Sequence, residues 1–320
     1  MKKKIVVIGG GHGSATMLRG LKTLPNVKLT SIVAVSDSGG STGRLRNLFD
    51  IPAIGDIRNV MTAMAEEETL FKFLMEYRFN NPLVKDEDVI GHNLGNLILY
   101  ALMDRQGGNL TEAISAASKV LNVQGQIIPS SLESITLYAK MADDTIVRGE
   151  ANIPQIDNSI SEVFFDHDVK ASYQAIRAIK EADIIVLGVG SLFTSILPNL
   201  IIKDIAQAIN NSKSPVVYYC NMMSETGETD GYCMEDHVHM INKHGVKVDA
   251  VVMADDIIPE SLLNRYSVSK QQLVLAKQKE HDFKVLRKNL LMFDSQQIRH
   301  SPDKIRNTFM DVLKEMGLRE

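Results

Sequence analysis

The sequence predicts an α/β protein with a doubly wound, mostly parallel, Rossmann-like sheet and a helical insertion. Short apolar runs rich in Val and Ile lack polar alternation, which is typical of strands buried on both faces. Helical patterns lie between these runs, and such alternation favours a doubly wound sheet. The strand-like runs occupy residues 4–10, 29–37, 182–190, 214–222 and 248–256.

The helices expected between these strands are short and amphipathic. They cover residues 14–24, 204–212 and 234–245, and Gly245 is placed to end the last of them. Residues 278–288 carry basic and acidic side chains by turns. We interpret that stretch as the solvated face of a further helix.

Two internal regions depart from the strand–helix alternation. Residues 56–124 contain three successive helical segments without an obvious strand, which predicts a helical insertion. Residues 126–166 are strand-like and predict a β-hairpin region, with Asp143 and Asp144 at its turn. Because no low-complexity linker or repeat divides residues 1–320, we expect a single α/β domain.

Composition excludes several classes of function. The net charge is -4 and no basic block is present, so binding of nucleic acid or of an anionic membrane has no electrostatic basis. Cys220 and Cys233 are too few for a disulfide framework and predict a cytoplasmic protein. The uncharged run 184–202 is too rich in glycine and polar residues to favour a membrane helix. His237 and His239 lack zinc-site spacing, and we expect them to be solvated.

The first glycine-rich loop lies within residues 6–18, where a strand, a glycine turn and a helix follow one another. Backbone N–H groups and the helix dipole at such a turn favour an anion such as phosphate. Gly9 and Gly11 match the dinucleotide fingerprint, but Ser14 replaces its third glycine. The alternative is a tight turn that only lets the helix pack on the sheet. The predicted phosphate contacts are Gly10, Gly11, His12 and Gly13.

A second glycine-rich loop follows Asp37, which ends the next strand. A nicotinamide enzyme would place its ribose-binding acid there, but a second loop does not suit such an enzyme. Two adjacent anion-binding helix starts instead suit a ligand with two phosphates. Ser41 and Thr42 can donate to phosphate oxygens, and Arg44 can pair with one bidentately. The alternative is a solvated turn with a capping hydroxyl. Further predicted contacts are Gly39 and Gly40.

Asp56 and Asn59 begin the next helix, shortly after the two loops. Asp56 either caps this helix or joins Asp37 in a carboxylate pair that could bind Mg²⁺ beside phosphates. The sequence predicts no obligatory cofactor, and Mg²⁺ is the ion that such a pair is expected to bind if it holds a metal.

Three later segments add candidate contacts. Asn93 and Asn96 share a helix face at i,i+3 spacing and need partners, either a ligand or the capped backbone. The loop after residues 182–190 suits a third phosphate or a sugar, and the loop after residues 214–222 is long enough to be functional. The contacts predicted in these two loops are Gly188, Gly190, Ser191 and Asn221.

Six motifs occur in the order of the CofD/YvcK family. They read GGGHGSATMLRGL, SDSGGSTGRLR, GDIRNVMTAMA, GHNLGNLIL, GVGSLFTSILPNL and CNMMSETGETDGY. The chain resembles this family from about residue 5 to about residue 256. It resembles the YvcK-like branch, known as gluconeogenesis factors, more than the 2-phospho-L-lactate transferases.

The resemblance implies a cytoplasmic regulatory protein that binds a nucleotide diphosphate sugar, a UDP-sugar such as UDP-N-acetylglucosamine. Its implied role is in cell shape and growth on gluconeogenic carbon, with a regulatory protein partner or a homo-oligomer compatible with that role. Tyr266 and Arg299 match the positions associated with the sugar nucleotide. The transferase branch would instead move a phospholactyl group from a guanosine diphosphate donor with Mg²⁺. Asp37 is followed by Ser38 where the family commonly has a second aspartate, which weakens the catalytic interpretation.

Overall fold

A computed structural model describes residues 2–66, 70–80, 89–294 and 297–318. Within these residues one sheet has seven strands in the order β10-β9-β8-β7-β1-β2-β3, and every pairing in it is parallel. This confirms the predicted doubly wound α/β fold. The strands are β1 (Lys3–Gly9), β2 (Val27–Val33), β3 (Gln126–Pro129), β7 (Ile184–Leu187), β8 (Val216–Tyr219), β9 (Ala250–Ala254) and β10 (Lys284–Lys288).

The sheet grows outward from β1 in both directions. β1 pairs with β2 on one side and with β7 on the other, so the strand order reverses there. Ile5, Val7 and Ile8 of β1 are fully buried, as expected for a central strand covered on both faces. In doubly wound sheets the crevice outside the carboxyl ends of two such strands is the usual ligand site.

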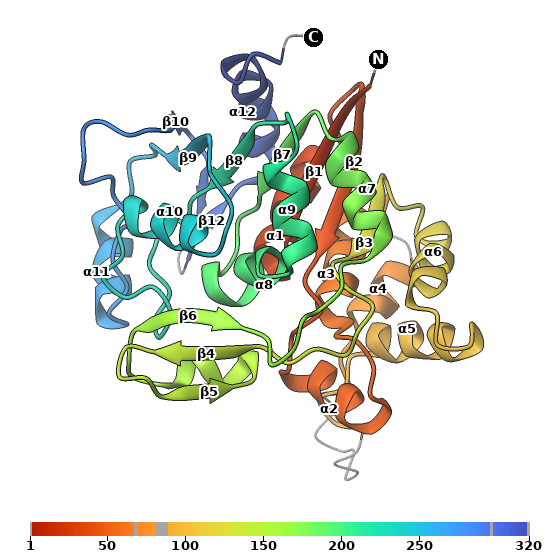
Figure 1. The fold of residues 1–320 in the computed structure, drawn as a ribbon. Helices are drawn as coiled ribbons and strands as arrows, with labels where there is room; N and C mark the ends of the chain where they lie inside the picture. Colours follow the sequence, from red (N-terminus) through yellow and green to blue (C-terminus); the bar gives the residue numbers. More distant parts are fainter. Residues whose placement is uncertain (1, 67–69, 81–88, 295–296, 319–320) are drawn as a thin grey trace.

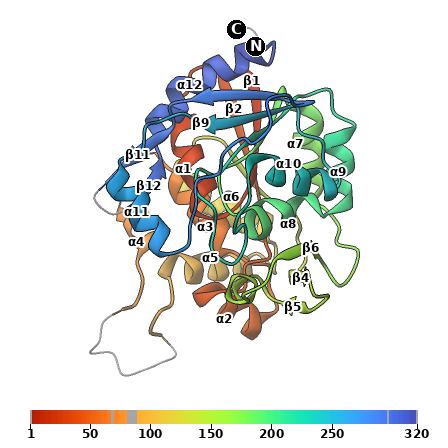
Figure 2. The same ribbon diagram turned by 90° about the vertical axis from the view of Figure 1, so that its left-hand side faces the viewer.

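Helices cover both faces of this sheet, as Figures 1 and 2 show. On one face α1 packs against α3 and α12. Gly20 of α1 allows a close approach, because a Cβ there would lie 2.3 Å from the Pro302 carbonyl oxygen. The helices of this face are α1 (Gly11–Leu21), α3 (Gly55–Met64) and α12 (Pro302–Glu315), and those over the other face include α7 (Tyr173–Glu181), α8 (Leu197–Leu200), α9 (Lys203–Asn210) and α10 (Met234–Lys243).

Two sequence predictions in this part of the fold are wrong. Residues 278–288 were expected to form a helix, yet β10 is the edge strand beside β9. Alternating charged and apolar side chains suit an edge strand as well as a solvated helix, and here only Leu286 is buried. His237 was expected to be solvated, but it faces the core from α10, where its Nδ1 lies 2.9 Å from the Tyr218 hydroxyl. Burial lowers its pKa to about 4.

Residues 56–124 hold most of α3 and the helices α4 (Leu70–Glu76), α5 (Leu94–Arg105) and α6 (Leu110–Val120). Parts of the insertion predicted there, 67–69 and 81–88, lie outside the described residues. α5 packs against α4 and α6. The second glycine-rich loop leads into α2 (Gly40–Phe49), which lies next to this group in Figure 1.

A small antiparallel sheet lies within residues 138–164 of the predicted hairpin region, whereas β3 at the start of that region belongs to the central sheet. β4 (Tyr138–Met141) pairs with β5 (Ile146–Arg148) and with β6 (Ile160–Phe164). Asp143 and Asp144 lie at the β4–β5 turn, and Asp144 adopts a positive φ of 66°. A short 3-10 helix, η1 (Glu150–Gln155), follows β5 and brings Glu150 toward the carboxyl edge of the central sheet.

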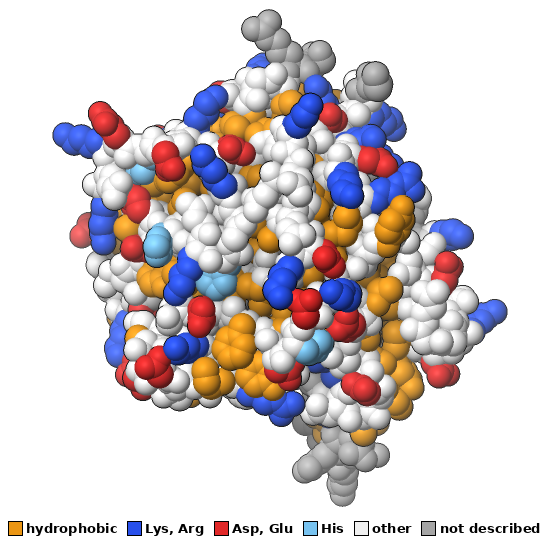
Figure 3. Space-filling view, viewed as in Figure 1, with side chains coloured by type: hydrophobic (Ala, Val, Ile, Leu, Met, Phe, Trp, Pro, Cys, Tyr) orange, Lys and Arg blue, Asp and Glu red, His pale blue; other side chains and the backbone are white. Residues whose placement is uncertain are grey.

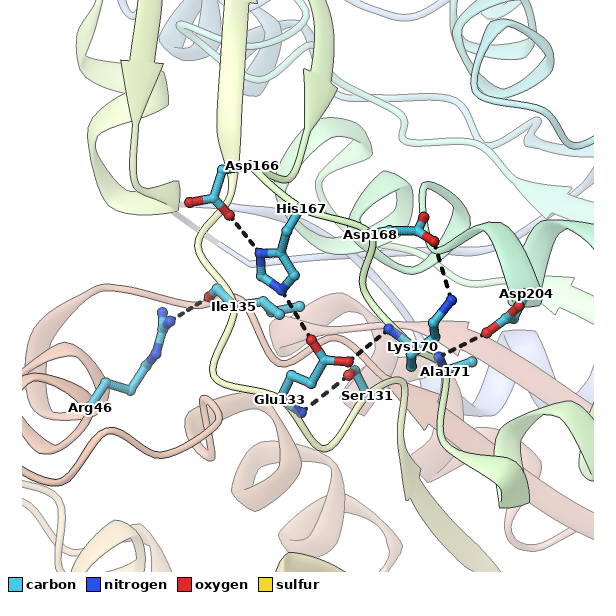
Figure 4. Close-up of polar contacts among 10 residues, drawn as sticks. All are labelled: Arg46, Ser131, Glu133, Ile135, Asp166, His167, Asp168, Lys170, Ala171 and Asp204. Atoms are coloured by element: carbon cyan, nitrogen blue, oxygen red, sulfur yellow. Dashed lines mark hydrogen bonds and ion pairs between the residues drawn. The ribbon is translucent and has the colours of Figure 1, made fainter.

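Two connections join the small sheet to the central one, and a polar cluster ties them together (Figure 4). The His167 ring lies 2.7 Å from Asp166 Oδ1 through Nδ1 and 3.0 Å from Glu133 Oε2 through Nε2. Glu133 also accepts a hydrogen bond of 2.9 Å from the Lys170 backbone N–H. Because Glu133 and His167 lie on different connections, the cluster pins both at the base of the small sheet.

We expect His167→Gln to remove a pH-dependent part of the stability. Hydrogen bonds to Asp166 and Glu133 raise the pKa of His167 above 6.5. A histidine whose pKa is raised by folding stabilises the folded state. This contribution is complete at pH values below the pKa of the unfolded state, and it is lost as pH rises through the pKa of the folded state. Urea unfolding at about pH 6 and about pH 8 should show that the variant loses more unfolding free energy at the lower pH. The loss should stay below about 1 kcal/mol, because His167 and its carboxylate partners are exposed. An equal deficit at both pH values would contradict the assignment.

Among the described helices, no single one has the length and apolar character to cross a membrane. The bent pair Leu192–Leu200 and Lys203–Asn210 meets the length and composition requirements only when taken together. Figure 3 shows Lys and Arg side chains interspersed with Asp and Glu over the described part of one molecular face.

Candidate functional site

A cavity of about 680 Å³ lies at the carboxyl edge of the sheet, around the β1–β7 switch point. The loops after β1, β2, β7 and β8 contribute to it, together with the start of α3. The predicted residues that line it are Gly10, Gly11, His12, Gly13, Asp37, Gly39, Gly40, Ser41, Thr42, Asp56, Asn59, Asn96, Gly190, Ser191, Asn221, Tyr266 and Arg299. The fold therefore brings together side chains from distant parts of the chain.

The first glycine-rich loop is pressed between two neighbours. A Cβ on Gly13 would lie 2.3 Å from the Val189 carbonyl oxygen, in the loop after β7. A Cβ on Gly10 would lie 2.4 Å from Asp56 Oδ2. Both glycines let the loop approach its neighbours closely, as the tight-turn interpretation expects. The same two residues also line the cavity, so the ligand-site alternative concerns them as well.

Asp56 holds the start of α1 rather than capping its own helix. Helix α3 begins at Gly55, and the Asp56 carboxylate accepts hydrogen bonds from the Gly11 N–H and the Asn59 side chain. Burial and the nearby Asp37 carboxylate outweigh these bonds and raise the pKa of Asp56 to about 7. Asp37 Oδ1 in turn accepts the Gly39 N–H at 2.8 Å. The two predicted acids therefore face the same cavity at close range.

The second glycine-rich loop is braced from α5. Ser41 Oγ accepts hydrogen bonds from the Asn93 N–H at 3.1 Å and the Asn96 side chain at 3.3 Å. Asn96 also donates to Thr42 Oγ1 at 3.4 Å. The hydroxyls expected to bind phosphate thus fix the loop to the insertion. The N-cap residues of α1 and α2 are Gly10 and Gly39, so neither N-cap residue supplies a capping side chain. Gly40, Ser41 and Thr42, in the first turn of α2, line the cavity.

Three predicted residues lie outside the cavity lining. Arg44 donates from Nη2 to the Ile90 carbonyl oxygen at 2.7 Å, so it does not lie where phosphate was expected. Asn93 caps α5 by accepting the Asn96 N–H at 3.0 Å, the capping alternative considered above. Gly188 faces the core, where a Cβ would lie 3.3 Å from Ser14 Oγ.

Two arginines outside the predicted set of contacts, Arg58 and Arg78, supply positive charge to the cavity. Arg58 of α3 is 9% exposed and donates from Nε to Asn96 Oδ1 at 3.1 Å and from Nη2 to Asn59 Oδ1 at 2.6 Å. Arg78 follows α4 and also lines the cavity. Arg58 lies in the GDIRN motif beside two predicted residues, which was a usable signal, whereas nothing in the sequence singles out Arg78.

Glu150 and Glu225 add further acidic side chains to the cavity lining. Burial, followed by the charges of Asp37 and Asp56, raises the pKa of Glu150. Burial and the neighbouring Glu228 carboxylate raise the pKa of Glu225, whose Oε2 is buried without a hydrogen-bond partner among the described residues. The cavity lining thus combines cationic and acidic side chains, and burial raises the pKa of several of the acids.

The later loops and the C-terminal segment complete the enclosure. Asn221 donates to the Gly190 carbonyl oxygen at 2.9 Å, which links the loops after β7 and β8. Tyr266, on α11 (Glu260–Val268), accepts the Ile298 N–H at 2.9 Å through its hydroxyl. Ile298 and Arg299 lie on β12 (Ile298–His300), which pairs with β11 (Leu291–Phe293). Tyr266 and Arg299 therefore sit beside the glycine loops despite their distance along the chain.

The carboxylates can contribute to a magnesium site but do not form one alone. No group of three or more His, Cys, Asp or Glu side chains among the described residues is arranged to hold a metal ion. Asp37 and Asp56 supply two acidic side chains, and Mg²⁺ commonly binds one or two carboxylates together with phosphate oxygens and water. The pair therefore fits an ion that arrives with a phosphorylated ligand.

A doubly wound parallel sheet with a charged cavity at its switch point defines a Rossmann-like α/β protein with a candidate ligand site. Residues 5–291 match the family model described as 2-phospho-L-lactate transferase CofD, and the chain belongs to this family. The match confirms the resemblance drawn from the six motifs.

Relatives within the family carry another name. A gluconeogenesis factor from Halalkalibacterium halodurans is 45% identical over 288 residues, covering 89% of this chain and 87% of the relative. The Bacillus subtilis gluconeogenesis factor is 39% identical over 321 residues, covering 98% of this chain and 99% of the relative. A crystal structure of a Bacillus halodurans protein is 40% identical and superposes with a TM-score of 0.91, covering 96% of this chain and 99% of that one.

Proposed function

We propose that this protein binds a nucleotide diphosphate sugar, of the UDP-sugar type, and acts as a regulatory protein rather than as an enzyme. The observation that carries the proposal is one cavity at the switch point that is lined by cationic side chains, acidic side chains and the first turn of α2. The gluconeogenesis-factor relatives support a role in growth on gluconeogenic carbon. A role in cell shape within the bacterial cytoplasm, and a downstream protein partner or self-association, belong to the same proposal.

The charges suggest how the ligand would lie. The pyrophosphate would rest on the N–H groups of the second glycine loop, where Arg58, Arg78 and Arg299 can neutralise it. Sugar and ribose hydroxyls would lie toward Glu225 and Asn221, because these side chains offer oxygen acceptors. Protonation of Asp56 or a Mg²⁺ ion between Asp37 and Asp56 would reduce repulsion of the phosphates.

A transferase-like activity is the second candidate, favoured by the paired carboxylates of Asp37 and Asp56 and by the family description. Mg²⁺ would supply phosphate charge neutralisation in such a reaction. Ser38 in place of a second adjacent aspartate leaves fewer acids for that role. Release of GMP from a guanosine diphosphate donor, dependent on Mg²⁺, would favour this candidate over the regulatory one.

Calorimetry with UDP-N-acetylglucosamine, GDP and NADH, each with and without Mg²⁺, tests the proposal. We expect saturable binding of the UDP-sugar without turnover, and Arg299→Gln should weaken it about tenfold by removing a charged donor. Tyr266→Ala should weaken it similarly, while Tyr266→Phe isolates the hydroxyl that accepts the Ile298 N–H. Wild-type affinity in both Arg299→Gln and Tyr266→Ala would reject the pocket assignment, and binding of NADH alone would reject both candidate functions.

A further inference from the structure

A second, smaller recess of about 250 Å³ lies beside the switch-point cavity. Helix α1 contributes His12, Ala15 and Arg19, which share a face because they are three and four residues apart. Helix α3 contributes Arg58, and the segment after α4 contributes Arg78. Arg58, Arg78 and His12 also border the larger cavity, whereas Arg19 lines only the recess.

The recess carries an excess of positive charge. Three guanidinium groups and the His12 ring face Glu76, the only acidic side chain among the described residues that line it. Burial and the charges of Arg58, Arg19 and Arg299 lower the pKa of His12. Burial and the neighbouring Arg78 likewise lower the pKa of Arg58, although the carboxylates of Glu76, Asp56 and Asp37 act in the opposite direction. These groups repel one another, and an anion between them would relieve the repulsion.

Arg58 has donors to spare at this position. Its three hydrogen bonds to described residues all go to neutral acceptors: Asn96 Oδ1, Asn59 Oδ1 and, at 3.4 Å, the Met75 carbonyl oxygen. A guanidinium carries five N–H groups, so two remain for a ligand. None of the ion pairs among the described residues includes this side chain, which is 9% exposed. The carboxylates of Glu76, Asp56 and Asp37 attract it only from longer range, so a bound oxyanion would supply the direct ionic hydrogen bonds that it lacks.

We propose that this recess binds a second small oxyanion, the phosphate or carboxylate group of a metabolite, separately from the ligand of the main cavity. Arg19, Arg58 and Arg78 would surround the anion and donate hydrogen bonds to its oxygens. Since Arg58 and Arg78 border both spaces, occupancy of the recess would change the affinity of the main cavity, and the effect would be reciprocal. The proposal does not depend on which nucleotide, if any, the main cavity takes.

Calorimetric titration of the full chain with inorganic phosphate tests this proposal, using one arginine from each space. We expect Arg19→Gln to weaken phosphate binding about tenfold and Arg299→Gln, which lies only in the main cavity, to change it less than about twofold. Arg306→Gln, on the exposed side of α12, is the matched control and should bind as the wild type does. Arg19→Lys should retain part of the affinity, because it keeps the charge but loses the bidentate geometry.

A parallel titration with succinate distinguishes the two sources of the anion. Both assignments below require that Arg19→Gln weakens the binding. Tighter binding of phosphate then assigns the recess to phosphate esters, and tighter binding of succinate assigns it to carboxylates. Saturable binding that depends on Arg299 and not on Arg19 would place the anion in the main cavity and overturn the proposal. Absence of saturable binding of both probes would overturn it as well. If UDP-N-acetylglucosamine fails to bind while Arg19-dependent anion binding persists, only the nucleotide-sugar proposal is lost.

Discussion

Replacing Gly13 by alanine is expected to lower the free energy of unfolding by about 3 kcal/mol and to abolish ligand binding in the switch-point cavity. The new Cβ would lie 2.3 Å from the Val189 carbonyl oxygen and 2.7 Å from Gly190 Cα. Both neighbours are backbone atoms that cannot rotate away. Helix α1 would have to separate from the loop after β7, which distorts two walls of the cavity at once.

Gly39→Ala is the matched control for this prediction. Gly39 belongs to the other glycine-rich loop and has a φ of -89°, which any residue adopts. A Cβ there would make ordinary contacts, 3.4 Å from Asp37 Oδ1 and 3.7 Å from Ala151 Cβ. We expect its unfolding free energy to fall by less than about 1 kcal/mol, the scale of an N-cap change. Urea unfolding measures both variants, and equal losses would show that close packing of Gly13 is not the cause.

Asp56→Asn is expected to raise the free energy of unfolding by about 2 kcal/mol above neutral pH. Burial and Asp37 raise the folded pKa of Asp56 from 3.8 to about 7. Between these two values the native state binds more protons than the unfolded state, so wild-type stability falls as pH rises and levels off above the folded pKa. The amide cannot ionise, yet its oxygen can still accept the Gly11 N–H.

Unfolding in EDTA across this pH window provides the measurement. The stability difference between Asp56→Asn and wild type should grow from acid to neutral pH, whereas exposed Asp157→Asn should follow the wild type throughout. Addition of Mg²⁺ should improve binding of UDP-N-acetylglucosamine to the wild type but not to Asp56→Asn, because one carboxylate is missing. A stability difference between Asp56→Asn and wild type that does not change with pH would mean that the surroundings do not disfavour the ionised form of Asp56.

Much of the candidate site was predictable because it follows strand ends. Gly10, Asp37 and Gly190 each come directly after an apolar run, and the carboxyl ends of parallel strands meet at one edge of a sheet. The same logic placed Asn221. Tyr266 and Arg299 could not be derived in this way, since neither follows a central strand, and they were identified through the family resemblance.

The differences between prediction and structure share a physical cause, which is that sequence patterns do not reveal direction in space. Arg44 follows a glycine loop as a phosphate-binding arginine would, yet its place on α2 takes it to Ile90 outside the cavity lining. Arg58 lies on a face of α3 that packing turns toward both the cavity and the recess. His237 has polar neighbours in sequence, as residues of solvated helices do. The face of α10 that carries His237 nevertheless packs against the core.

The sequence by itself determined the parallel α/β class, the two glycine-rich loops and the acids that follow the strands, because strand and helix periodicities and turn residues are local properties. Only the tertiary structure decided that Asp56 holds the start of α1, that Arg58 and Arg78 supply the positive charge, and that β10 completes the sheet. These outcomes depend on contacts between segments far apart in the chain. Which groups share a low-dielectric space, and therefore which pKa values shift, is fixed by those contacts rather than by neighbours in sequence.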